Sequence, residues 1–220
     1  MNQYRTDLAI ECQEILDESA GIQMEKIEYN GGIRVTRIKI ISQEAAKKMG
    51  KPVGSYITLE ADGVLEEEDG IKEKTAKAVA GELGQLLRVD YTLKVLVAGL
   101  GNNDITPDAL GPQAAAKVLA TRHLRDELDN DEEQFLTSLR RVSSFAGGVL
   151  GQTGIESAEM IRAICRELKP AAVIAVDALA CSDVSRLGTT IQISDSGISP
   201  GSGVANTRRE LSQRVLGVPV

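Results

Sequence analysis

The 220-residue sequence lacks tryptophan and contains only two phenylalanines, one histidine and three cysteines. A core with so few large aromatic side chains must be built mainly from Val, Ile, Leu and Ala. The cysteines, Cys12, Cys165 and Cys181, are widely spaced, which favours reduced thiols over a disulfide framework or a zinc site. With a single histidine, His123, the sequence is poorly suited to a nucleophilic site that uses histidine as its base, or to a metal site with several histidine ligands.

Long apolar runs are also missing. No stretch approaches the roughly 20 residues that a membrane helix requires, and the first residues lack the apolar core of a signal peptide. The net charge is −7 and the pI is near 4.9, with Lys and Arg scattered along the chain. Because nucleic-acid phosphates bind to a basic face, we expect no direct nucleic-acid partner. These features predict a soluble cytoplasmic protein with one sizeable core.

The first third of the chain carries the clearest strand pattern. Residues alternate between apolar and polar over Ile33–Ile40, which predicts a half-buried strand in a hairpin or at a sheet edge. A short helix is expected over residues 42–49, a second strand over 56–60, and an amphipathic helix over 69–87. Residues of about 30–62 are therefore expected to form a small N-terminal β-rich extension or subdomain.

From residue 93 onward the pattern becomes strand, loop, helix. The expected strands are residues 93–98, 141–145, 171–176 and 189–193, and the expected helices are residues 112–123, 156–168 and 206–215. The acidic segment 125–134 predicts an exposed helix or loop. Repeated β-loop-α units predict an α/β fold with a mostly parallel sheet and helices on both faces.

Two aspartates follow apolar strands of this expected sheet. Asp108 lies in the loop after residues 93–98, and Asp177 directly follows residues 171–176. Ligands of open α/β sheets bind in the crevice outside the carboxyl ends of the strands, so both acids could face one substrate. If both carboxyl groups reach one water, they can share a proton and divide the roles of acid and base.

Plainer interpretations exist for each aspartate. Asp108 follows Thr106 and Pro107, an arrangement typical of a helix or turn start, where an acid often caps backbone amides. Asp177 ends an apolar strand, where a structural acid can bond the amides of the next loop. The residue pattern leaves the structural and the catalytic interpretations open.

Other site classes have weaker support. Residues 99–101 begin like a dinucleotide-binding loop, but Asp104 stands where the third glycine belongs. A serine hydrolase would have only His123 as its base and lacks a Gly-x-Ser-x-Gly elbow. A thiol mechanism at Cys181 would need the same histidine. The glycine-rich stretch 194–203 can present backbone amides to an anion or can simply be a flexible loop.

Seven blocks in order along the chain resemble the germination protease of spore-forming bacteria. They are residues 5–11, 99–102, 106–112, 121–124, 151–156, 177–180 and 190–198. The resemblance implies an aspartic-type endopeptidase that begins the degradation of small acid-soluble spore proteins at germination. It also implies the fold shared with hydrogenase-maturation endopeptidases, catalytic roles for Asp108 and Asp177, no cofactor and no metal, and a location in the spore core.

The resemblance further implies a zymogen that processes itself between Asp7 and Leu8. Residues 1–7 would then be a propeptide and residues 8–220 a single α/β peptidase domain. Because family members form homotetramers, a homo-oligomer is expected. The remaining candidates, expected to orient the peptide substrate, are Glu156, Asp195, Gly197 and Asn102.

Two alternative functions stay open. Family members usually continue past the position where this sequence stops, so part of the family domain is expected to be missing at the C-terminal end. A truncated homologue that binds spore proteins without cleaving them is therefore one alternative. The other is a metal-dependent endopeptidase of the hydrogenase-maturation type in the same crevice, although a single histidine weighs against it.

Overall fold

The protein is described by a computed structural model that divides into two compact units. The description covers residues 6–14, 20–29, 31–87, 90, 92–124, 139–200 and 209–220, so the predicted segment 125–134 lies outside it. The described residues of the first unit fall within Met1–Arg88 and Leu179–Ser196. Those of the second unit fall within Val89–Ala178, Gly197–Ser202 and Asn206–Val220.

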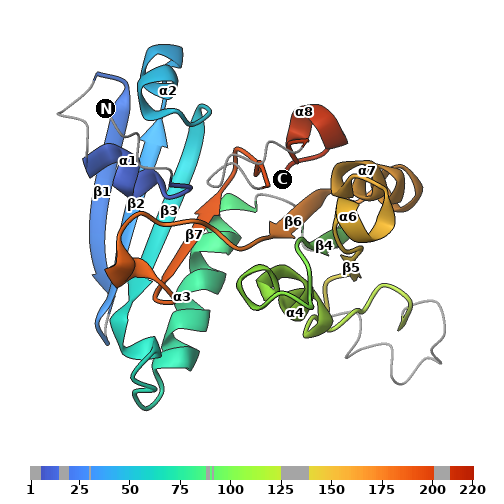
Figure 1. Cartoon of the computed structure of the whole chain (residues 1–220), viewed down its shortest axis with the longest axis horizontal. Helices are drawn as coiled ribbons and strands as arrows, with labels where there is room; N and C mark the ends of the chain where they lie inside the picture. The colour runs from blue at the N-terminus through green and yellow to red at the C-terminus, as the bar shows by residue number, and fades with distance from the viewer. Residues whose placement is uncertain are drawn as a thin grey trace. The chain divides into compact units, whose positions relative to one another are not determined.

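The first unit contains a four-stranded antiparallel sheet in the order β1-β2-β3-β7 (Figure 1). Its strands are β1 (Ile22–Tyr29), β2 (Ile33–Ile40), β3 (Gly54–Ala61) and β7 (Thr190–Ser194). Gly31 and Gly32, both with positive φ, form the tight turn of the β1-β2 hairpin, a conformation that glycine adopts without steric cost. β7 pairs antiparallel with the edge of β3, with Ile193 opposite Ile57.

The prediction of a mostly parallel sheet is therefore wrong. β2 occupies the predicted residues, but β1 was not predicted, and β7 joins the antiparallel sheet instead of extending the parallel one. β1, β2 and β3 form a β-rich N-terminal part of the chain, which β7 joins from later in the sequence. The alternation in residues 189–193 encodes a strand with two faces, but it does not encode the partner strand or its direction.

Helices cover both faces of the antiparallel sheet. They are α1 (Ala9–Glu14), α2 (Gln43–Met49) and α3 (Ile71–Leu86). Alternate residues of β2 enter different clusters: Ile38 and Ile40 pack with residues of α1 and α2, whereas Ile33 and Val35 pack with residues of α3. Because both faces of β2 are covered, most of its residues are buried and its few exposed positions are charged.

A buried charge ties α3 to the sheet. The Glu82 side chain is fully buried, and its carboxylate accepts hydrogen bonds from Arg37 at 2.7 and 3.0 Å and from the Tyr29 hydroxyl at 2.8 Å. Burial alone would raise the pKa of Glu82, but these hydrogen bonds hold it below its ordinary value. Loss of one partner would leave an uncompensated buried charge, which is strongly destabilising.

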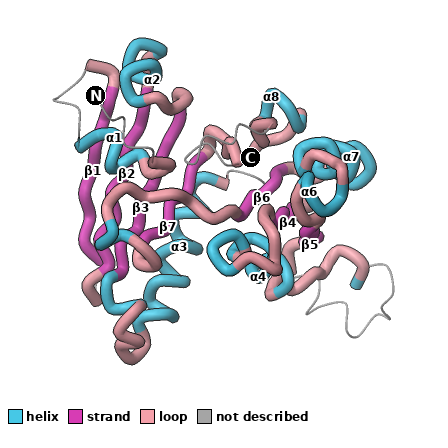
Figure 2. The backbone as a smooth tube through the Cα atoms, viewed as in Figure 1, coloured by secondary structure: helices cyan, strands magenta, loops and turns pink. Residues whose placement is uncertain are grey.

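The second unit contains a three-stranded parallel sheet in the order β5-β4-β6 (Figure 2). The strands β4 (Val95–Gly99), β5 (Val142–Ala146) and β6 (Ala172–Val176) confirm the three predicted here to within two residues at each end. Its helices are α4 (Leu110–Ala116), α6 (Leu150–Thr153), α7 (Ser157–Leu168) and α8 (Gln213–Leu216). Side chains of β4, α7 and β6, including Leu96, Ile161 and Val173, form its core.

Two predicted helices of this unit differ from those observed. The helix predicted over 112–123 begins two residues earlier and ends at Ala116, well before His123. Of the helix predicted over 206–215, residues 206–208 lie outside the described residues. In the remainder only α8 is helical, because Leu211 forms a bridge with Ile198 and Ser212 is extended. Among the helices in the described ranges, none combines the length and apolarity needed to cross a membrane.

Candidate active site

The carboxyl edge of the parallel sheet brings the two aspartate-bearing segments together. β4 lies beside β6, with Gly99 opposite Val176, and the Leu100 N–H donates a 2.8 Å hydrogen bond to the Val176 carbonyl. Asp177 follows Val176 directly, so it leaves the sheet at the edge where the β4 loop begins. The first connection runs from β4 to β5, away from β6, which is the arrangement that opens a crevice at a strand edge.

Two glycines, Gly99 and Gly111, let α4 pack closely against the carboxyl ends of β4 and β6. A Cβ atom on Gly111 would lie 2.1 Å from the Leu100 carbonyl oxygen and 2.4 Å from the Val176 carbonyl oxygen. A Cβ atom on Gly99 would lie 2.2 Å from the Gly111 carbonyl oxygen. Only glycine permits such close backbone approach, so these positions fix the start of α4 against the ends of β4 and β6.

Asp108 belongs to the short helical turn η2 (Thr106–Asp108), which precedes α4. Its carboxylate does not cap α4 but turns back over the loop, where Oδ2 accepts a 2.8 Å hydrogen bond from the Asn102 N–H. The same side chain covers Gly101, whose φ is +112° and where a Cβ atom would lie 2.9 Å from Asp108 Oδ1. Asp108 therefore caps neither η2 nor α4, but its bond to a loop amide keeps the structural interpretation beside the catalytic one.

Asn102, predicted to orient substrate, contacts Asp108 through its backbone. Its side-chain Oδ1 accepts hydrogen bonds from the Asp104 N–H and from Gln152 Nε2, both at 2.9 Å. Gln152 lies in α6, so this bond joins the β4 loop to the segment after β5. Sequence reasoning missed Gln152, because one glutamine in a four-residue helix carries no spacing signal; only its place in a resemblance block marked it.

Asp177 is half-buried, and its Oδ1 accepts a 3.0 Å hydrogen bond from the N–H of Ala178. A bond to the next amide of the loop is what a structural acid makes, so this interpretation stays beside the catalytic one. The structure therefore places both aspartates on loops at one edge of the sheet, each oriented by a backbone amide.

The other predicted orienting residues have contacts that explain them structurally. Asp195 lies in the first unit, where its Oδ1 accepts a 2.7 Å hydrogen bond from the Ser55 N–H. Gly197 has a φ of +80°, and a Cβ atom there would lie 2.2 Å from the Leu211 carbonyl oxygen. Glu156 is the N-terminal cap residue of α7 and contributes its carbonyl oxygen to the helix without a side-chain capping bond.

The described residues give little support to a metal site or to a cysteine nucleophile. In the part of the chain that the structure describes, no three His, Cys, Asp or Glu side chains converge to form a possible metal site. The metal-dependent alternative therefore lacks a ligand set within those residues. Burial raises the pKa of the Cys12 and Cys165 thiols, which is the opposite of what an activated nucleophile requires.

Two aspartates at the carboxyl ends of neighbouring parallel strands lie where α/β proteins bind their ligands, so the fold and the site define the class of α/β proteins with a carboxylate-bearing crevice. Comparison with known sequences identifies the family within that class. The sequence model described as germination protease matches residues 3–220, so this chain belongs to the germination protease family.

Three relatives illustrate the similarity. The germination protease of Caldanaerobacter subterraneus subsp. tengcongensis is 46% identical over 218 residues, covering 98% of this chain and 66% of the relative. That of Clostridium tetani is 42% identical over 98% of this chain and 67% of the relative. That of Bacillus subtilis is 42% identical over 100% of this chain and 62% of the relative. The chain thus spans about two thirds of the length of these relatives.

Proposed function

We propose that this protein is an endopeptidase that begins the degradation of small acid-soluble spore proteins in the spore core during germination. Membership of the germination protease family supports the reaction and the substrate class. The observation that carries the proposal is the placement of Asp108 and Asp177 on the loops that leave the neighbouring strands β4 and β6. The proposal includes self-processing between Asp7 and Leu8, a peptidase domain over residues 8–220, and a homotetramer.

In the proposed mechanism the two aspartates act on one water molecule and one peptide bond. One carboxylate accepts a proton as the water oxygen attacks the scissile carbonyl carbon. The other carboxyl group, protonated, donates to the carbonyl oxygen or to the leaving amine. In this mechanism either aspartate can take either role.

The surroundings of Asp108 support a positioned catalytic group. Its Oδ2 is oriented by the Asn102 amide, and Asn102 is in turn held by Gln152. A general acid or base must be held within hydrogen-bond reach of the proton it moves, so an ordered loop contributes to the rate. Asn102 and Gln152 are therefore proposed as positioning residues.

The test is to incubate the purified chain with a small acid-soluble spore protein and to identify the products by mass spectrometry. The Asp108→Asn and Asp177→Asn variants keep the side-chain size but lose the proton-transfer group. We expect cleavage by the wild-type chain and a loss of about a hundredfold or more in each variant. Asp69→Asn, at an exposed aspartate in the first unit, is the matched control and should cleave normally.

Two other outcomes would redirect the proposal. A folded chain that binds the spore protein without cutting it would identify a non-catalytic binder. Cleavage that depends on added divalent metal and survives both asparagine substitutions would identify a metal-dependent endopeptidase.

A further inference from the structure

The segment before α1 is hydrogen-bonded to Ala180 within the first unit. The Asp7 N–H donates a 2.8 Å hydrogen bond to the Ala180 carbonyl, and the Ala180 N–H donates a 3.0 Å bond to Asp7 Oδ2. Thr6 adds a 3.4 Å bond from its hydroxyl to the same carbonyl. Asp7 is therefore held through both its backbone and its acidic side chain, just before α1 begins at Ala9.

The carbonyl oxygen of Asp7 has two side-chain donors. Lys51 Nζ lies 2.9 Å from it and Gln192 Nε2 lies 3.1 Å from it. Lys51 extends from the turn after α2, and Gln192 belongs to β7, so two separate elements converge on one oxygen. This oxygen belongs to the peptide bond between Asp7 and Leu8, the bond at which self-processing is proposed.

Gln192 also bonds the next peptide unit along the chain. Its Oε1 accepts a 2.7 Å hydrogen bond from the Ala9 N–H, while its Nε2 donates to the Asp7 carbonyl. The side-chain amide of Gln192 therefore holds the backbone on both sides of Leu8, whose own N–H donates a 3.0 Å hydrogen bond to the Thr6 hydroxyl oxygen. Between these anchors the Leu8 side chain is 2% exposed and packs in the cluster with Ile10, Ile38 and Met49.

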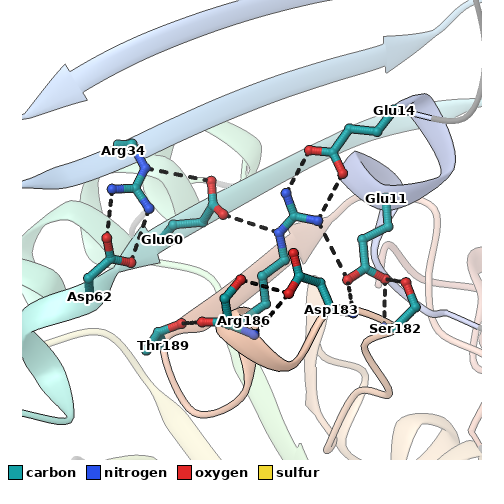
Figure 3. Close-up of polar contacts among 10 residues, drawn as sticks. Glu11, Glu14, Arg34, Glu60, Asp62, Ser182, Asp183, Arg186 and Thr189 are labelled. Carbon is teal, nitrogen blue, oxygen red and sulfur yellow. Dashed lines mark hydrogen bonds and ion pairs between the residues drawn. The ribbon is translucent and has the colours of Figure 1, made fainter.

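Charged contacts fix the residues that follow. Glu11 is buried, and its carboxylate accepts hydrogen bonds from the backbone N–H groups of Ser182 and Asp183 and from the Ser182 hydroxyl, at 2.7 to 3.0 Å (Figure 3). Figure 3 also shows the Arg186 guanidinium between Glu14, Glu11 and Glu60. These contacts attach α1 to the segment after Ala180 and keep the Asp7–Leu8 bond in register with its donors.

We propose that Lys51 and Gln192 form an oxyanion site that binds the carbonyl oxygen on the amino side of the scissile bond. In this structure Asp7 occupies the site. Beside this carbonyl oxygen, the Asp7 carboxylate accepts a hydrogen bond from the Ala180 N–H, and the Leu8 side chain lies in the apolar cluster with Ile10, Ile38 and Met49. The inference deepens the proposed function, since it requires that the Asp7–Leu8 bond be hydrolysed.

The chemistry needs only water as co-reactant. The water oxygen forms a bond to the Asp7 carbonyl carbon, and the pair of electrons displaced from the C=O bond makes that oxygen anionic. The carbon–nitrogen bond to Leu8 then breaks as the C=O bond re-forms, and one water proton passes to the leaving amine. Lys51 and Gln192 donate to the oxygen on which the negative charge develops, which lowers the barrier without any transfer of their own protons.

The test follows the appearance of the new amino terminus at Leu8 by mass spectrometry, in the full chain and over a range of pH. Lys51→Met removes one donor. Gln192→Glu keeps the acceptor for the Ala9 N–H but loses the donor to Asp7, so it separates polarisation from binding. We expect each to slow self-cleavage by about a hundredfold, as removal of an oxyanion donor does elsewhere. Lys51→Arg should recover part of the rate, and Lys48→Met, at an exposed lysine of α2, should match wild type.

Hydrogen exchange at the Ala9 amide distinguishes the proposed oxyanion role of Gln192 from a merely structural role. If Gln192 were only structural, slower self-cleavage would be accompanied by loss of protection at Ala9. In Gln192→Glu the Ala9 amide should stay protected while self-cleavage slows. Wild-type rates in both Lys51→Met and Gln192→Glu would overturn the inference. A chain that cuts a spore protein but never its own Asp7–Leu8 bond would overturn the inference and the self-processing part of the proposed function, and would leave the proposed cleavage of spore proteins standing. A chain that cuts neither would overturn both.

Discussion

The backbone N–H of Asn102 donates a 2.8 Å hydrogen bond to Oδ2 of Asp108, six residues later in the same loop. Asn102 is itself held by Gln152, which lies beyond the next strand in the sequence. The orientation of Asp108 therefore depends on a residue that touches neither the aspartate nor, in the proposed mechanism, the substrate. A substitution at Gln152 therefore tests whether the conformation of this loop matters for activity while the Asp108 carboxylate is kept.

Gln152→Leu should lower kcat by about tenfold, which is less than the roughly hundredfold or more expected for loss of a proton-transfer group, and leave KM little changed. The substitution removes the donor to Asn102 Oδ1 but keeps both aspartates. Steady-state cleavage of a spore protein measures both constants. Gln113→Leu, at an exposed position of α4, is the control, and equal kinetics in the two variants would contradict the positioning role.

Gly111→Ala should destabilise the second unit by at least about 2 kcal/mol, because overpacking against fixed backbone costs about 1–3 kcal/mol. Its new methyl group would lie within 2.5 Å of backbone atoms at the ends of β4 and β6. Denaturant unfolding measures the loss. Gly151→Ala has open space around its methyl group and should change the free energy of unfolding by less than about 1 kcal/mol. Wild-type stability in Gly111→Ala would show that α4 does not need this close approach.

Glu11 should make stability depend on pH at the acid end. Burial alone would raise its pKa, but hydrogen bonds from Thr6, Ser182 and Asp183 lower it from 4.5 to about 2. Because the folded-state value lies below the unfolded one, the stabilisation is fully present above pH 4.5 and is lost as pH falls toward 2. We expect a loss on the order of 2–3 kcal/mol over that window.

The pH dependence of unfolding, measured in denaturant from pH 7 to pH 2, checks this. Glu11→Gln should lower stability at pH 7 and flatten the acid slope, whereas Glu66→Gln, at an exposed glutamate, should leave the slope unchanged. An acid slope that is the same in Glu11→Gln and wild type would contradict the assignment to Glu11.

Arg186→Met should destabilise the first unit by about 3 kcal/mol, since removal of one partner from a buried ion pair costs about 3–5 kcal/mol and part of this network is exposed. The Arg186 side chain is 11% exposed and bridges Glu14, Glu60 and Glu11 at 2.6, 3.2 and 3.5 Å. Arg186→Lys keeps the charge but cannot reproduce the planar fork, so it should recover only part of the loss. If Arg186→Lys, Arg186→Met and the wild type show equal stability in thermal unfolding, this role of Arg186 is contradicted.

The sequence was sufficient to predict the parallel strands and the position of the two aspartates. Uninterrupted apolar runs mark strands buried on both faces, and carboxyl ends of parallel strands meet at one edge, so Asp177 and the Asp108 loop could be placed without coordinates. The role of the pair stays a prediction, because apolar patterning reports burial and not chemistry.

The antiparallel sheet was harder to predict for a physical reason. The alternation in β7 indicates a strand but not its partner, and its pairing with β3 depends on contacts between segments more than 120 residues apart in the sequence. Likewise, Lys51 and Gln192 converge on the Asp7 carbonyl only after α2 and β7 are folded. No local spacing connects such residues, so their convergence became visible only in the structure.

The most direct test of the account is a double-variant cycle on Asp108 and Asp177. The kcat/KM for cleavage of a spore protein would be compared in wild type, Asp108→Asn, Asp177→Asn and the double variant. If both carboxyls act on one water, each single variant should lose at least about a hundredfold and the double variant little more, because residues that act as a unit are not additive. Retention of more than a tenth of wild-type activity in either single variant, or losses that simply multiply, would contradict the account.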